Sequence, residues 1–89
     1  MTGPNEDFRH VSNRLLAHIL RTEPRQLRPG DVQQALGWTL DALGRDVIDT
    51  SLPRQFLDAR IEAAGRAAQA VKRGQRGKAH AELRRFWSI

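Results

Sequence analysis

Residues 51–77 read SLPRQFLDARIEAAGRAAQAVKRGQRG and predict a long helix with a defined start and end. Thr50 or Ser51 can cap the helix, because a hydroxyl oxygen accepts a hydrogen bond from a free N–H of the first turn. Pro53 fits that first turn, where its missing N–H costs nothing. Gly74 predicts the end, since glycine readily takes the left-handed conformation that closes many helices.

We expect this helix to run from about Arg54 to Arg73. Its apolar face is dominated by alanine, and small side chains let helix axes approach toward the short end of the usual range of about 8–10 Å. A neighbouring helix should therefore pack tightly against it. The apolar positions at helical spacing are Phe56, Leu57, Ile61, Ala64, Ala67, Ala68 and Val71.

Residues 5–23 predict the first helix. Asn5 is a good N-cap, and acidic side chains follow it where the helix dipole favours them. The helix should end at Glu23, because a residue before proline is pushed out of the helical region. One apolar stripe runs along this segment and comprises Phe8, Val11, Leu15, Leu16, Ile19 and Leu20.

A short last helix is expected over about residues 78–87, with Leu83, Phe86 and Trp87 on one side. No strand-like alternation is visible. The chain has 89 residues, 39% hydrophobic and 28% charged, which is the composition of a folded single domain. The sequence therefore predicts an all-α bundle of four or five helices over residues 1–89, frayed at residues 1–4 and 88–89.

The segment DVQQALGWTLDALGRDVI, residues 31–48, has two interpretations. Its apolar residues recur at helical intervals and Asp31 can cap it, which favours one continuous amphipathic helix. Gly37 and Gly44 interrupt that helix, each at a cost of about 1 kcal/mol relative to alanine. Either both glycines lie on one face and let another helix approach closely, or Gly37 is a turn between two shorter helices. The apolar positions are Val32, Leu36, Leu40, Leu43 and Val47.

The same eighteen residues resemble the helix-turn-helix segment of bacterial transcriptional regulators. There a short helix ends in Ala-Leu-Gly, as at Gly37, and a hydroxyl residue, here Thr39, opens the second helix. The resemblance implies that the second helix enters the major groove of DNA and presents Thr39, Asp41, Ala42 and Arg45 to it.

Positive charge is concentrated in the C-terminal part of the chain. Residues 1–53 carry six basic and seven acidic side chains, whereas residues 54–89 carry nine basic and three acidic ones, for a net charge of +5 overall. Such a cluster either contacts phosphates or complements helix ends and maintains solubility. The candidate nucleic-acid-binding residues are Arg66, Lys72, Arg73, Arg76, Lys78, Arg84 and Arg85.

No motif for catalysis is present. The chain has no cysteine, and His10, His18 and His80 show no metal-ligand spacing with one another. We therefore expect a non-enzymatic protein without metal or cofactor. Charged residues among the first twenty and the lack of a long apolar run predict a cytoplasmic protein with no membrane contact.

Two functions remain open. The first is a regulatory protein that binds nucleic acid, with DNA preferred, through its basic C-terminal helices. The second is a protein-protein interaction module that docks on an acidic partner surface, anchored by Trp38, Phe86 or Trp87. Phe86 and Trp87 could also stack on bases or belong to the core. Because so short a chain without disulfides buries little surface, a homodimer is expected as well.

Overall fold

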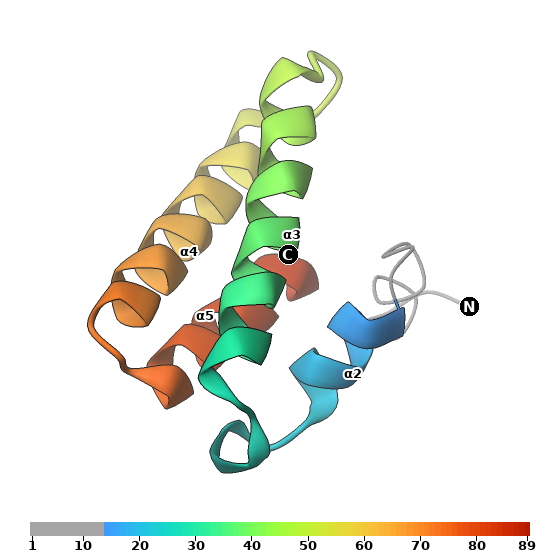
Figure 1. Cartoon of the computed structure of the whole chain (residues 1–89). Coiled ribbons are helices and arrows are strands. Elements are labelled where there is room, and N and C mark those ends of the chain that lie inside the picture. The colour runs from blue at the N-terminus through green and yellow to red at the C-terminus, as the bar shows by residue number, and fades with distance from the viewer. Residues whose placement is uncertain (1–13) are drawn as a thin grey trace.

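The computed structural model describes residues 14–89 as four α-helices and one 3-10 turn (Figure 1). This confirms the all-α prediction for the described part of the chain. No helix in these residues has the length and apolar character to cross a bilayer. The elements are α2 (Arg14–Arg21), η1 (Pro24–Gln26), α3 (Pro29–Ile48), α4 (Arg54–Lys72) and α5 (Arg76–Ser88).

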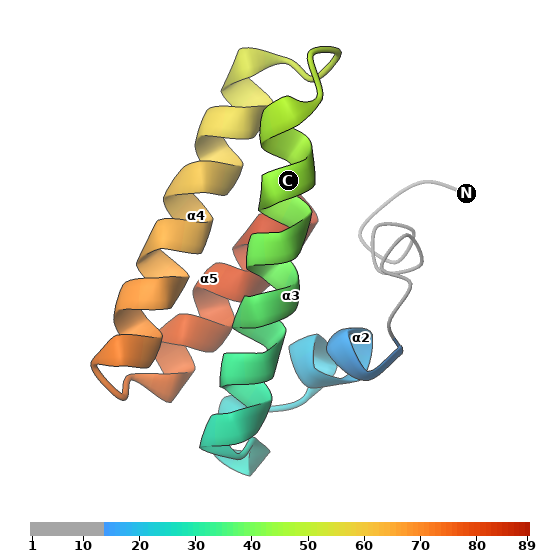
Figure 2. The ribbon, with the colours of Figure 1, turned by 45° about the horizontal axis from the view of Figure 1, so that its top comes forward.

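The two long helices α3 and α4 form an antiparallel hairpin, and α5 crosses behind both of them (Figure 2). The short helix α2 lies beside the first half of α3 and also contacts α5. The bundle is flat, with principal extents of 36 × 29 × 16 Å. In both views, no described helix covers the side of α3 that faces away from α5.

Residues 29–48 form one continuous helix, so the interpretation with a turn at Gly37 is wrong. The helix begins at Pro29, and the backbone N–H of Arg28 donates to Asp31 Oδ2 at 3.1 Å. Asp31 thus sits in the first turn and is not the cap that the sequence predicted. This bond satisfies a free N–H at the helix start, where the dipole favours a carboxylate.

The buried face of α3 is displaced from the apolar stripe that the sequence predicts. Val32, Ala35, Thr39 and Ala42 are buried, while larger aliphatic residues of the stripe lie at its edge. The physical reason is the alanine face of α4, against which small side chains pack at close range. The most exposed member of the predicted stripe is Val47, at 55%.

Helix α4 buries Ala63, Ala64, Ala67 and Ala70 against its neighbours, which confirms the predicted alanine packing. Its predicted cap is wrong, because Pro53 occupies the N-cap position and no side chain caps the helix. The Ser51 and Thr50 hydroxyls play no such part. Instead, the Ser51 backbone N–H and hydroxyl both donate to Asp49 Oδ1, at 3.0 and 2.6 Å.

The two ends of the chain compare differently with the predictions. Asn5 and residues 1–4 lie outside the described residues. The first described helix ends at Arg21, two residues before the end at Glu23 that the sequence predicts. The sequence predicts fraying of residues 88–89; in the structure α5 includes Ser88, and Ile89 packs against the core.

A cation lies among the aromatic rings of the core. The Arg60 guanidinium pairs with Asp46 of α3 at 2.8 Å, and the two side chains are only 12% and 19% exposed. Its central carbon lies 4.4 Å from the Phe86 ring centre and 4.7 Å from that of Phe56. Stacking on rings and pairing with a carboxylate suit the planar guanidinium, so this cluster joins α3, α4 and α5.

Candidate nucleic-acid interface

The turn between α4 and α5 brings the basic residues of both helices together. Gly74 has a φ of 72°, in the left-handed region that favours glycine. The Gln75 N–H donates to the Ala70 carbonyl at 2.8 Å and the Gly74 N–H to that of Val71 at 3.0 Å. These two bonds are the pattern of a Schellman motif and confirm the predicted glycine end of α4. The chain reverses within the next residues, so α5 packs back along α4.

Three cations from the two helices line one concavity of about 160 Å³. Arg66 reaches it from α4, Arg73 from the C-cap position of α4, and Lys78 from the first turn of α5. We call this concavity the α4–α5 basic site. Its full lining is Arg66, Gln69, Ala70, Arg73, Gln75, Lys78 and Glu82. Arg73 and Gln69 also border a more open concavity that includes Lys72.

The start of α5 adds positive potential to the site. A helix N-terminus carries free N–H groups and about half a positive charge, which normally attracts an acidic residue. The first turn of α5 holds no acidic residue, contains Lys78 and has no side-chain cap. Cations are therefore held where the helix dipole disfavours them, and an anion bound there would relieve the repulsion.

Two carboxylates lie near the site and reduce its charge only in part. Glu62 pairs with Arg66 at 2.8 Å, but both side chains are more than half exposed, so the pair contributes little. Glu82 lines the site, and its Oε1 is buried without a hydrogen-bond partner. With three cations against Glu82, the lining stays positive.

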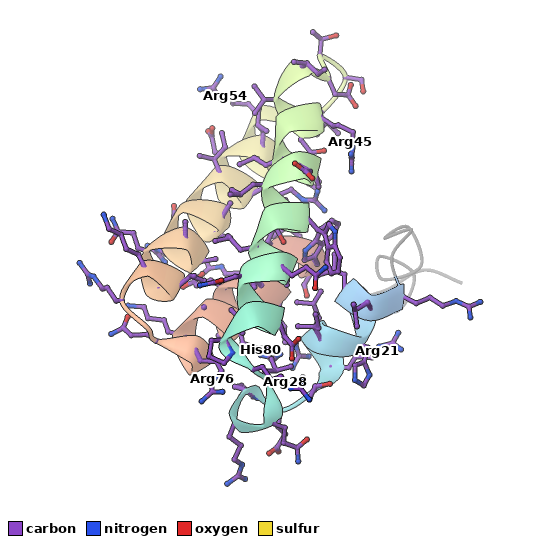
Figure 3. All side chains as sticks on the ribbon, in the orientation of Figure 1. Arg21, Arg28, Arg45, Arg54, Arg76 and His80 are labelled. Atoms are coloured by element: carbon purple, nitrogen blue, oxygen red, sulfur yellow. The ribbon has the colours of Figure 1, made fainter. Side chains whose placement is uncertain are left out.

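Three of the predicted basic contacts lie elsewhere. Arg76 donates from Nη1 to the Leu27 carbonyl and thereby ties α5 to η1 (Figure 3). Arg76 borders a different concavity, with Val32 and Val71. Arg84 and Arg85 are exposed on the second half of α5. The structure thus assembles four of the seven predicted cations around adjoining concavities and leaves three apart.

The residues predicted to read DNA do not form a readout face. Thr39 is completely buried and its hydroxyl donates to the Ala35 carbonyl at 2.8 Å. Ala42 is buried too and belongs to the hydrophobic core. Their predicted exposure to the major groove is therefore wrong. Asp41 and Arg45 are exposed, but on a continuous helix without the preceding turn.

The predicted partner anchors are also mostly core residues. Phe86 is fully buried and Trp87 is 8% exposed, and their rings meet edge to face at 5.1 Å between centres. Neither ring is available to stack on a base or to enter a partner's pocket. Trp38 is half-buried and packs against the core.

Sequence reasoning missed Gln69 and Gln75, whose side chains line the α4–α5 basic site. Helical spacing could have indicated Gln69, because it lies three residues after Arg66 and four before Arg73 and so shares their helix face. In residues 14–89, no three histidine or acidic side chains are grouped so that they could hold a metal ion. No family model, curated protein or solved structure matches the chain.

Proposed function

We propose that this protein is a non-enzymatic binder of nucleic acid, with DNA as the preferred form, and that phosphates occupy the α4–α5 basic site. The observation that carries the proposal is the convergence of Arg66, Arg73 and Lys78 on one concavity. Guanidinium and ammonium groups are the side chains that most often contact the phosphate backbone.

The contacts are expected to be independent of base sequence. The lining offers cations and two amides but no aromatic ring, and the aromatic residues of α5 are buried. Base stacking is therefore absent from the proposed mode, and affinity comes from release of counterions. With Lys72 beside the site, about three or four phosphates would be neutralised, so log K should fall with log salt with a slope of about −3.

The test is a titration of mixed-sequence duplex DNA at several salt concentrations. The variant Arg73→Ala/Lys78→Ala should weaken binding and reduce the salt slope by about one for each lost cation. The matched control is Arg25→Ala/Arg54→Ala, which removes the same charge from exposed ion pairs outside the site. Figure 3 shows Arg54 at the far end of α4 from the α4–α5 turn. Equal losses for the two variants would mean that only net charge matters and would refute the site.

The alternative is docking of an acidic protein surface on the same cations. Trp38 is the one predicted anchor that stays partly exposed, so Trp38→Ala is the informative variant for this function. A wild-type protein that binds neither duplex nor single-stranded DNA at low salt, yet captures one acidic protein through Trp38, would replace the nucleic-acid proposal with this one.

A further inference from the structure

Helix α3 presents an uncovered face that alternates glycine with aliphatic residues. Gly37, Leu40, Gly44 and Val47 follow one another at spacings of three, four and three residues, which is the spacing of a helix-pairing seam. Leu40 and Val47 are 44% and 55% exposed, and no described helix lies over this side in Figure 1. Ile48, at the end of the same face, is 79% exposed.

The two glycines are not covered by any other part of residues 14–89. A Cβ built at Gly37 or at Gly44 would meet no atom of residues 14–89 within 4 Å, so no packing among the described residues requires glycine there. Each glycine nevertheless costs about 1 kcal/mol in a helix interior relative to alanine. Their cost is explained if a second helix packs against the backbone at these two positions.

The spacing makes this face complementary to itself. If two copies of α3 cross antiparallel, Leu40 of one helix meets Gly44 of the other, and Val47 meets Gly37. The residue numbers in each pair sum to 84, so a single antiparallel register brings both pairs together. The two-fold symmetry of the dimer then repeats each pair on the other side of the axis. Every aliphatic side chain then fills the space above a glycine.

Charges beside the seam fit the same register. Asp41 and Arg45 are both exposed, and among residues 14–89 neither of them forms an ion pair. Arg45 points away from α4 in Figure 3. In the antiparallel register, Asp41 of each helix is level with position 43 of the other, which is two residues, or about 3 Å along the axis, from Arg45. The long arginine side chain can span this offset, so two symmetrical ion pairs can form.

We propose that the exposed face of α3 pairs with the same face of a second copy of this chain, in an antiparallel symmetric dimer. Leu40 and Val47 supply the buried apolar contacts, Gly37 and Gly44 allow close approach, and Asp41 with Arg45 sets direction and register. The α4–α5 basic site is formed by other elements, so binding of nucleic acid and dimerisation can be tested separately.

The test is the molar mass of the full chain across a micromolar to millimolar concentration series, by light scattering and sedimentation. The wild type should shift from monomer to dimer. The variant Gly37→Gln/Gly44→Gln fills both gaps and should weaken dimerisation by about tenfold or more. Glutamine is a good helix former and meets open space, so the variant monomer should melt no lower than the wild type.

Two comparisons make the test specific. Gly65→Gln, at an open glycine of α4, is the matched control and should leave the dimer unchanged. Asp41→Arg and Arg45→Asp should each weaken the dimer, and the double exchange should restore it. A monomeric wild type, a dimer indifferent to the glutamines, or a double exchange without rescue would each overturn the proposal.

Discussion

The indole Nε1–H of Trp87 donates a hydrogen bond to the Thr39 hydroxyl at 2.9 Å, in the buried space between α3 and α5. The Thr39 hydroxyl in turn donates a hydrogen bond to the Ala35 carbonyl at 2.8 Å, so the indole N–H, the hydroxyl and the carbonyl all have partners. The link joins residues 48 positions apart in the chain.

Thr39→Val should destabilise the fold by about 1–3 kcal/mol, because it leaves the buried indole N–H without an acceptor. Trp87→Phe should cost stability as well, through lost packing and the lost bond. The double variant has no indole N–H left without an acceptor. Its loss of unfolding free energy should therefore be smaller than the sum of the losses in the two single variants. Urea unfolding of all four proteins measures this coupling, and strictly additive costs would show that the bond contributes nothing.

Arg60→Lys should destabilise the protein although it keeps the charge. The guanidinium lies against the rings of Phe56 and Phe86 while it pairs with Asp46, and an ammonium group cannot make this planar contact. The expected loss is about 1–2 kcal/mol in urea unfolding. Arg54→Lys, at an exposed ion pair of the same helix, is the control and should change stability by less than about 0.5 kcal/mol. Equal effects at both positions would refute the role of stacking.

Alanine should have opposite effects at two glycines. Gly74→Ala forces a side chain into the left-handed conformation at φ 72° and should cost about 1 kcal/mol. Gly65→Ala lies inside α4 in open space and should stabilise by up to about 1 kcal/mol through helix propensity. Thermal melts followed by circular dichroism compare the two variants. A stabilising Gly74→Ala would contradict the strained conformation of that residue.

The pKa of Asp49 should lie below its usual value of 3.8, because the Ser51 hydroxyl and backbone N–H both donate to its carboxylate. A lowered folded-state pKa contributes stability above pH 3.8, and this contribution disappears as the pH falls through the lowered value. Ser51→Ala should raise the pKa of Asp49 toward 3.8, as measured by carboxyl carbon chemical shifts in an NMR titration. An unchanged titration would show that the hydroxyl bond is absent in solution.

The elements that depend on local signals could be predicted from the sequence. The extent of α4, its alanine face and its end at Gly74 all follow from residues close together in the chain. The side of α3 that faces the core could not be predicted. Periodicity identifies the aliphatic stripe, but α4 and α5 pack against the adjoining face with Ala35 and Thr39.

The candidate site was predictable only as a collection of charges. The local excess of arginine and lysine indicated Arg66, Arg73 and Lys78, because helical spacing and one short turn bring them together. Arg76 belongs to the same run of charge, yet it bonds to the Leu27 carbonyl, 49 residues away. No local pattern in the sequence reveals such a partner. Gln75 also lines the site but is uncharged, so the search for clustered charge did not find it.

The alanine face of α4 does not by itself determine how the helices are aligned, so the polar contacts between helices must do so. Methyl groups are nearly interchangeable when one helix slides along another, so they supply cohesion but little preference for a single alignment. Three polar contacts fix how the helices are aligned with one another. They are the Thr39–Trp87 hydrogen bond, the Arg60–Asp46 ion pair and the hydrogen bond from His80 Nε2 to the Ile19 carbonyl. A variant that lacks these three contacts should keep its helices and its compactness, while the packing around its aromatic side chains fluctuates, as in a molten globule.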